Sequence, residues 1–178
     1  MGGVRARDDD LDGAMRVVTV GPVTTDIGAP AALVYQMLAA IGQGSQEGGE
    51  RAEIIEAEGN ILVCDFWTHV AMPIGNDRLV RTRERVTLRP PDRIDYEHLD
   101  GPVAGLRETI TVGEAPDGQV LLTYRGSYEA PSLLAYLRAR QFARPAIDRI
   151  MHEHFADVRN RAEARARRSR VFTSEYSR

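Results

Sequence analysis

Four residues that can exchange protons lie in strand-like segments, at positions where the alternating pattern calls for apolar side chains. They are Glu84, His98, Glu108 and Tyr124. The neighbouring positions on the same face are filled mainly by Val, Ile, Leu and Tyr. A carboxylate or imidazole on a buried face is costly unless it is paired. The four residues therefore form either a satisfied buried network or a functional site, and they are the candidate catalytic residues of this sequence.

Hairpin geometry predicts that these residues form one row. In an antiparallel pair, residues equidistant from the turn lie opposite each other, ~5 Å apart. Counting outward from each turn predicts that Glu84 faces His98 and that His98 faces Glu108. The same count places Tyr124 opposite Glu108 and Phe66 opposite Glu84. A register slip of two residues would keep the face but break the row.

The chemistry of such a row is proton transfer. Negative neighbours favour the protonated form of His98, whereas burial disfavours it, and opposed effects of this kind tune a group for acid–base work near neutral pH. A carboxylate could remove a proton from an enolisable ligand, while His98 or Tyr124 donates to a carbonyl or enolate. That would suit an aldol-type cyclisation or a dehydration. Alternatively, the two glutamates only satisfy His98, and the row is a polar wall that orients a ligand.

The opposite face of the same segments is rich in Arg, Asp, Glu and Thr, which indicates a solvated surface. The hairpin count predicts an ion pair between Asp65 and Arg85 there, and a cation–π contact between Trp67 and Arg83. In a rival interpretation this face lies inside, as an Arg-lined pocket for an anionic ligand. Burying several arginines without matched anions is very costly, so the solvated interpretation is favoured.

Turn residues divide the chain into seven strand-like segments and two helical ones. A helix is predicted over residues 31–42, with Pro30 at its start. From Pro131 the apolar residues recur at helical spacing, and Pro145 should kink or restart that helix. The strand-like segments are residues 16–26, 51–58, 61–72, 78–88, 93–99, 105–112 and 119–129.

The length of 178 residues favours a single domain. Residues 1–14 are charged, Gly-rich and aperiodic, which predicts a disordered tail. The folded domain is expected over residues 15–168, followed by a polar tail, residues 169–178, that frays. A lone meander would leave its apolar face wet, so the last helix must cover it.

Composition excludes several functions. The chain has no Lys, hence no Schiff-base or P-loop lysine, and its single cysteine, Cys64, excludes an internal disulfide and a multi-cysteine metal site. The net charge of −3 does not suggest nucleic acid. No apolar run reaches the ~20 residues of a membrane span. A cytoplasmic protein without cofactor is expected, as a monomer or homodimer. No metal is predicted, because His152 and His154 are two apart on a helix and point to different sides.

Three segments resemble the START/Bet v1-like superfamily, the helix-grip fold, which includes polyketide cyclase/aromatases and coenzyme Q-binding proteins. DIGAPAALVYQML resembles its opening strand and helix, HLDGPVAGLRETITV its sixth-strand segment, and LRARQFARPAIDRIMHEHFADVRNRAEAR its closing helix. The likeness spans about residues 16–168. It implies an α+β fold in which a curved seven-stranded antiparallel sheet wraps around a long C-terminal helix. It also implies an internal cavity for a hydrophobic, oxygenated small molecule such as a polyketide, lipid or quinone.

Three functions follow as hypotheses: a polyketide cyclase-like enzyme, a non-catalytic lipid or quinone carrier or sequestering resistance protein, and an interaction module with a collapsed cavity. Tyr35 and Tyr128 could frame a cavity mouth, and His154 could turn inward beside Met151 and Phe155. Core packing, or a purely structural histidine, is the alternative for these residues. The expected ligand-binding residues are Tyr35, Phe66, Thr68, Thr82, Tyr96, Tyr128, Met151, His154 and Phe155.

Overall fold

The computed structural model describes residues 16–43, 49–70 and 77–175, with side chains described as far as residue 169. The predicted N-terminal tail lies outside these ranges. The strands are β1 (Arg16–Ile27), β2 (Arg51–Glu58), β3 (Ile61–Val70), β4 (Arg78–Arg89), β5 (Arg93–Asp100), β6 (Arg107–Glu114) and β7 (Val120–Ala130). The helices are α1 (Ala31–Ala39), α2 (Leu133–Arg138) and α3 (Arg144–Glu175), with a π-helical turn, η2 (Ala139–Ala143), before α3.

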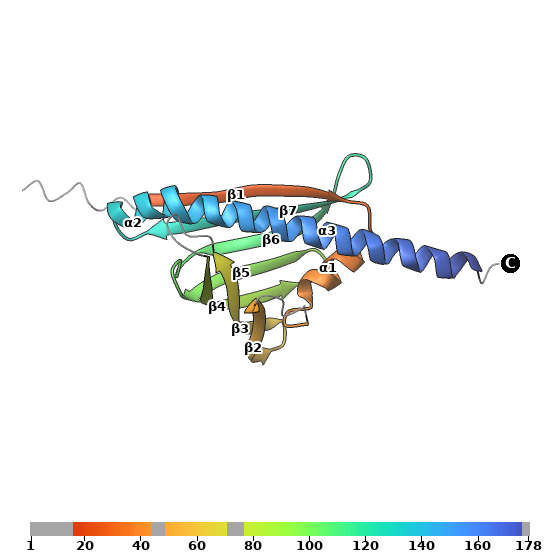
Figure 1. Cartoon of the computed structure of the whole chain (residues 1–178), viewed down its shortest axis with the longest axis horizontal. Coiled ribbons are helices and arrows are strands. Elements are labelled where there is room, and N and C mark those ends of the chain that lie inside the picture. The colour runs from red at the N-terminus through yellow and green to blue at the C-terminus, as the bar shows by residue number, and fades with distance from the viewer. Residues whose placement is uncertain (1–15, 44–48, 71–76, 176–178) are drawn as a thin grey trace, which may run out of the picture.

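The strands form one antiparallel sheet in the order β1-β7-β6-β5-β4-β3-β2. Consecutive strands from β2 to β7 are hairpin neighbours, and β1 returns to pair with β7, so β1 and β2 are the edges. The sheet curves beneath α3, which lies along β1 (Figure 1). The predicted α+β helix-grip architecture is confirmed.

An apolar stripe on α3 closes the core. Its members, Ile147, Met151, Phe155, Val158 and Ala162, are three or four residues apart, the spacing that places side chains on one face of a helix. Phe155 and Ala162 are fully buried and Val158 nearly so. This stripe explains why the polar C-terminal segment is helical, because tertiary packing supplies most helical stability.

The predicted irregularity near Pro145 takes the form of η2, which ends two residues before this proline. Proline has no amide donor and crowds the carbonyl four residues earlier, and a π-turn is one way in which a helix accommodates such a break. Beyond it α3 runs to Glu175, seven residues past the predicted end of the domain. None of the described helices is both long enough and apolar enough to cross a membrane.

A bulge in β1 fixes α3 onto the sheet. The pairing of β1 with β7 shifts between Val20 and Val23, around Gly21. Gly21 has a φ of +75°, and a Cβ there would lie 2.9 Å from the carbonyl oxygen of Tyr124, so only glycine fits. The amide of Gly21 donates to Oδ1 of Asp148 on α3 at 2.9 Å. The helix is thereby attached beside Tyr124.

Candidate functional site

The strand register confirms one of the four predicted pairs and shifts the other three. Glu84 lies opposite His98, as predicted. Glu108, however, lies opposite Tyr96 on β5 and Gly126 on β7, two positions away from the predicted partners. The alternation of faces is unchanged by a shift of two, so all the candidates still occupy the inner face of the sheet.

Turn geometry accounts for the shifts. The β5–β6 hairpin closes with the amide of His98 donating to the carbonyl of Leu106. The β6–β7 turn closes between Ala115 and Gln119, with Gly118 at positive φ. Tyr124 consequently lies opposite Ile110. On the other side, the partner of Glu84 is Cys64 rather than Phe66.

The four side chains nevertheless meet, because neighbours on a diagonal remain within reach of long side chains. His98 Nε2 lies 2.7 Å from Oε2 of Glu108, and His98 Nδ1 lies 3.5 Å from Oε1 of Glu84. The hydroxyl of Tyr124 donates to Oε1 of Glu108. Each side chain is about nine-tenths buried or more. We call Glu84, His98, Glu108 and Tyr124 the polar cluster.

Two residues outside the cluster hold it in shape. The hydroxyl of Thr82, two residues before Glu84 on the same face, donates to Oε1 of Glu84 at 2.5 Å. Gly126 leaves space for the phenol: a Cβ there would lie 3.2 Å from the hydroxyl of Tyr124. Thr82 was predicted only as a ligand contact, and Gly126 was not singled out. A glycine inside a strand is the signal that could have revealed it.

Burial and charge shift the titration of the cluster. Burial alone would lower the pKa of His98, but its hydrogen bond to Glu108 and the charge of Glu84 outweigh this and raise it. Burial raises the pKa of Glu84, although the charge of His98 partly opposes the rise. Burial and the charge of Glu108 raise the pKa of Tyr124, so its phenol stays neutral. The cluster therefore favours an imidazolium beside a carboxyl group that is easily protonated.

Two buried polar atoms have no hydrogen-bond partner among the described residues. They are Nδ1 of His98 and the hydroxyl of Tyr35 on α1. Buried polar groups are almost always paired in folded proteins. Nε2 of His98 is engaged by Glu108, whereas Nδ1 makes only the 3.5 Å ion-pair contact with Glu84, so Nδ1 is the nitrogen with capacity to hydrogen-bond a further molecule.

The remaining predicted ligand residues differ in burial. His154 is exposed on α3, with its ring 6.3 Å from that of Phe155, so it does not turn inward, and a contact with a ligand stays a prediction. Phe155 is completely buried in the core. The others on the inner side are only partly buried, which shows that solvent reaches that face; they are Phe66, Thr68, Thr82, Tyr96, Tyr128 and Met151.

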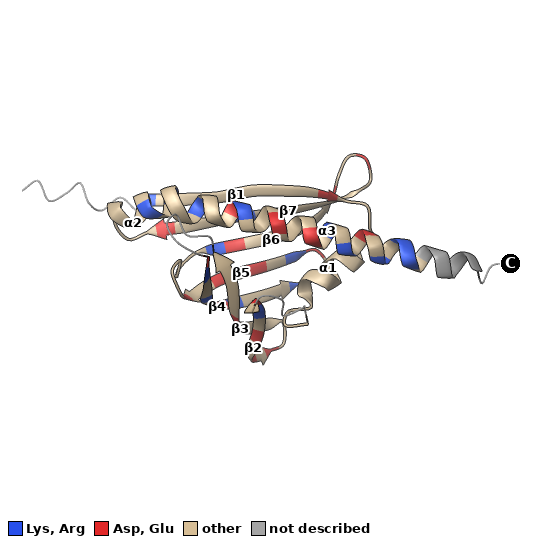
Figure 2. Cartoon of the chain, viewed as in Figure 1, with Lys and Arg blue, Asp and Glu red and all other residues tan. Residues whose placement is uncertain are grey.

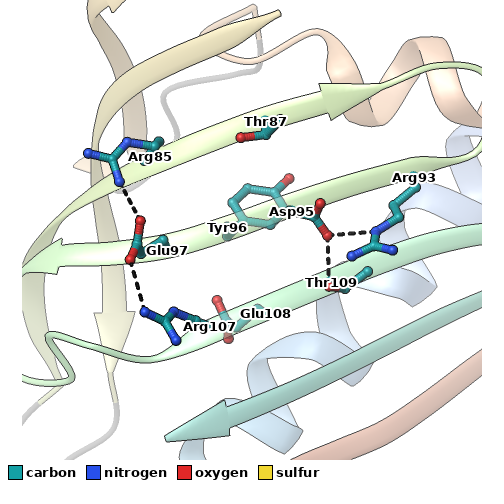
Figure 3. A pocket seen from close by; sticks show the side chains of 9 residues that line it. All are labelled: Arg85, Thr87, Arg93, Asp95, Tyr96, Glu97, Arg107, Glu108 and Thr109. Carbon is teal, nitrogen blue, oxygen red and sulfur yellow. Dashed lines mark hydrogen bonds and ion pairs between the residues drawn. The ribbon is translucent and has the colours of Figure 1, made fainter.

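The outer face carries a shallow hollow of about 270 Å³ over β4, β5 and β6. Figure 3 shows its charged side chains bridging one another: Glu97 pairs with both Arg85 and Arg107, and Asp95 pairs with Arg93. With these charges matched, the hollow is a solvated ion-pair surface, as predicted. Tyr96 and Glu108 also border this hollow, but their positions alternate along the strands with those of the charged residues, which places their side chains, like the rest of the polar cluster, on the inner face.

The predicted contacts of Asp65 and Trp67 were wrong in their partners. Asp65 pairs with Arg81 and Arg83 at 2.9 and 2.7 Å rather than with Arg85. It is buried, and the hydrogen bonds from these arginines hold its pKa at about 2 despite that burial. Trp67 stacks against Arg51, whose guanidinium carbon lies 3.8 Å from the ring centroid.

The polar cluster also contains a set of groups that metals use. Glu84, His98 and Glu108 each offer one ligand atom, and these atoms lie within 4.8 Å of one another. Binding a metal through Nε2 would require His98 to give up its bond to Glu108. The absence of a metal therefore stays a prediction.

No protein-family model matches this sequence. A search of curated proteins likewise found no significant match. Solved structures do match. The Zhui aromatase/cyclase from Streptomyces sp. R1128 superposes with a TM-score of 0.66 at 22% identity, over 85% of this chain and 96% of that one. The di-domain aromatase/cyclase StfQ from the steffimycin biosynthetic pathway gives 0.68 at 21%, over 84% of this chain.

The chain has the helix-grip fold of these aromatase/cyclases. It spans about half of StfQ, 52% of that chain. A START superfamily protein from Mycobacterium smegmatis matches more loosely, with a TM-score of 0.52 at 14% identity, over 85% of this chain and 97% of that one. At these identities the likeness concerns the fold.

Proposed function

We propose that this protein binds a hydrophobic, oxygenated small molecule between the inner face of the sheet and α3, and that the polar cluster catalyses its cyclisation or dehydration. The observation that carries the proposal is the unpaired, buried Nδ1 of His98 beside the carboxylate of Glu84. An acid and a base held next to each other on a partly open apolar face are what enolate chemistry requires.

The roles follow from the hydrogen bonds. Glu84 removes a proton from the carbon next to a ligand carbonyl, and the resulting enolate carbon bonds to a second carbonyl carbon. The imidazolium of His98 gives its Nδ1 proton to the alkoxide that forms. Before a dehydration, the proton on Glu84 returns to Nδ1 of His98, 3.5 Å away. Glu84 then takes a second carbon-bound proton while His98 protonates the hydroxyl group, which leaves as water, and the same proton return restores both residues. Glu108 is a positioning residue that holds Nε2, and Tyr124 in turn orients Glu108.

A weakly specific probe can test this chemistry. Benzoylacetone is apolar, enolisable and carries two carbonyl groups, and exchange of its central protons for deuterium reports carbon deprotonation. We expect the protein to accelerate this exchange and Glu84→Gln to slow it by about a hundredfold, a typical contribution of general base catalysis. Binding of the probe, measured by equilibrium dialysis, should change little. The matched control is Glu97→Gln on the outer face of β5, which should exchange at the wild-type rate.

A second function is favoured by one observation. Thr82 and Tyr124 already donate to the two carboxylates, so the cluster would also serve as a rigid polar wall in a non-catalytic carrier. Under that alternative, Glu84→Gln weakens binding of benzoylacetone, and the wild-type protein does not exceed the exchange rate of buffer. That pair of results would contradict the catalytic proposal and support the carrier.

A further inference from the structure

Exposed apolar side chains gather at the helical connection between β7 and α3. Leu133, Leu134 and Leu137 of α2 and Phe142 of η2 are 49%, 57%, 40% and 54% exposed. Scattered apolar residues are normal on a protein surface, but these four lie within ten residues of sequence. Leu133 and Leu137 are one helical turn apart, so their side chains share a side of α2. We call the four residues the α2 patch.

The charge of this connection is one-sided. Arg138, Arg140 and Arg144 lie between Pro131 and Ile147, and no acidic residue does. The chain as a whole has a net charge of −3. The acid that follows, Asp148, is already engaged by the amide of Gly21 and lies 3.8 Å from Arg144. Basic residues are visible along this end of the helical segment in Figure 2.

The position of the patch connects it to the proposed ligand space. The α2 helix lies at one end of the molecule, beside the start of β1 and the end of β7 (Figure 1). The chain that follows contributes Ile147 and Met151 to the rim of the core, and Tyr128 at the end of β7 packs there too. An object that contacts the α2 patch is therefore next to the partly open inner face.

We propose that the α2 patch and its three arginines dock this protein on an anionic lipid bilayer, from which the hydrophobic ligand enters. Leucine and phenylalanine side chains enter the boundary between headgroups and acyl chains, while arginines pair with lipid phosphates. A bilayer fits better than an acidic protein, because exposed Leu and Phe side chains interspersed with arginines in one short helical segment match both the acyl-chain boundary and the phosphates of a lipid surface, and such a surface needs no shape complementarity. The ligand route rests on the proposed function; the docking rests on the surface alone.

Vesicle co-sedimentation of the full chain tests the docking. Wild-type protein should bind mixed phosphatidylcholine–phosphatidylglycerol vesicles and bind pure phosphatidylcholine vesicles much more weakly. The double variant Leu134→Asp with Phe142→Asp should lose about 20-fold in partitioning, and Arg138→Gln with Arg140→Gln about tenfold on the anionic vesicles. The matched control is Ile54→Asp with Ile55→Asp on β2, where the side chains are 48% and 45% exposed; it should bind like the wild type.

Three outcomes of these experiments would overturn the docking proposal. Equal partitioning of the wild type and the Leu134/Phe142 variant, or no binding of the wild type to anionic vesicles at low salt, overturns the proposal. So does binding to an immobilised acidic protein without binding to vesicles, which would assign the patch to a protein partner. If the double variant does not fold, Leu134→Gln alone replaces it. Benzoylacetone exchange in vesicle-free solution reports separately on the proposed function, because it does not require the patch.

Discussion

An imidazole between two carboxylates is the most consequential arrangement at the scale of single residues. Glu108 fixes one ring nitrogen of His98 at 2.7 Å, and Glu84 lies 3.5 Å from the other. Two potential negative charges thus surround one positive charge inside the fold. A buried cluster of this kind is stable only while the positive charge on His98 balances the carboxylates, and this couples the stability of the protein to pH.

The direction of that coupling can be predicted for His98. Its pKa in the folded chain is raised above the ordinary value of 6.5. The stabilisation is therefore complete below about pH 6.5 and is lost as the pH rises through the folded-state pKa. We expect His98→Gln to lower the free energy of unfolding more at acidic than at alkaline pH, as measured by urea denaturation. His152→Gln, on the exposed side of α3, is the control; a pH-independent deficit for His98→Gln would contradict the assignment.

Sequence alone predicted which residues share the inner face but not every contact among them. Alternation along each strand fixes the face of Glu84, His98, Glu108 and Tyr124, because a strand has a strict period of two. The unpaired hydroxyl of Tyr35 has no such signal, since it depends on how α1 packs against the sheet. The space provided by Gly126 depends on its neighbours on the adjacent strand.

At the scale of secondary-structure elements, the register between neighbouring strands is the feature that was hardest to predict from the sequence. The β4–β5 turn, with Pro90, Pro91 and Asp92, was counted correctly, whereas the hairpins at Gly101–Gly105 and Ala115–Gln119 were each displaced by two. Loops of five or more residues can place their extra residues on either arm, so counting cannot find their centre. The helices were better predicted, because Pro30 and the apolar stripe of α3 mark them directly.

The stability of the fold depends on α3, and one residue tests this. Phe155 is completely buried against the sheet. Replacing it with alanine should lower the free energy of unfolding by about 3–5 kcal/mol, the usual effect of removing a buried aromatic ring. Chemical denaturation measures the loss. Phe142→Ala is the matched control: that ring is 54% exposed, and its removal should change stability by less than about 0.5 kcal/mol.

At the scale of the whole molecule, the sheet is open, and its edge strands, β1 and β2, have unpaired backbone groups through which two copies of the chain could associate. The β2 edge bears exposed Ile54 and Ile55, but also Glu53, Glu56 and Glu58. Antiparallel pairing of two copies along this strand would bring like charges together, which opposes assembly.

We therefore expect a monomer at neutral pH, as measured by sedimentation velocity. Replacing the three β2 glutamates with glutamine should promote association, because the exposed isoleucines remain while the repulsion is removed. A wild-type dimer that is insensitive to these substitutions would mean that assembly uses another surface.

Each member of the polar cluster is carried by a separate strand in the interior of the sheet, and none by a loop. Paired strands cannot easily move to fit a ligand, so molecules whose oxygen atoms do not match the positions of the polar cluster should bind poorly. Substitutions intended to broaden ligand specificity should therefore be made in α1 and η2, which can shift without breaking any strand pairing, and not in the strands.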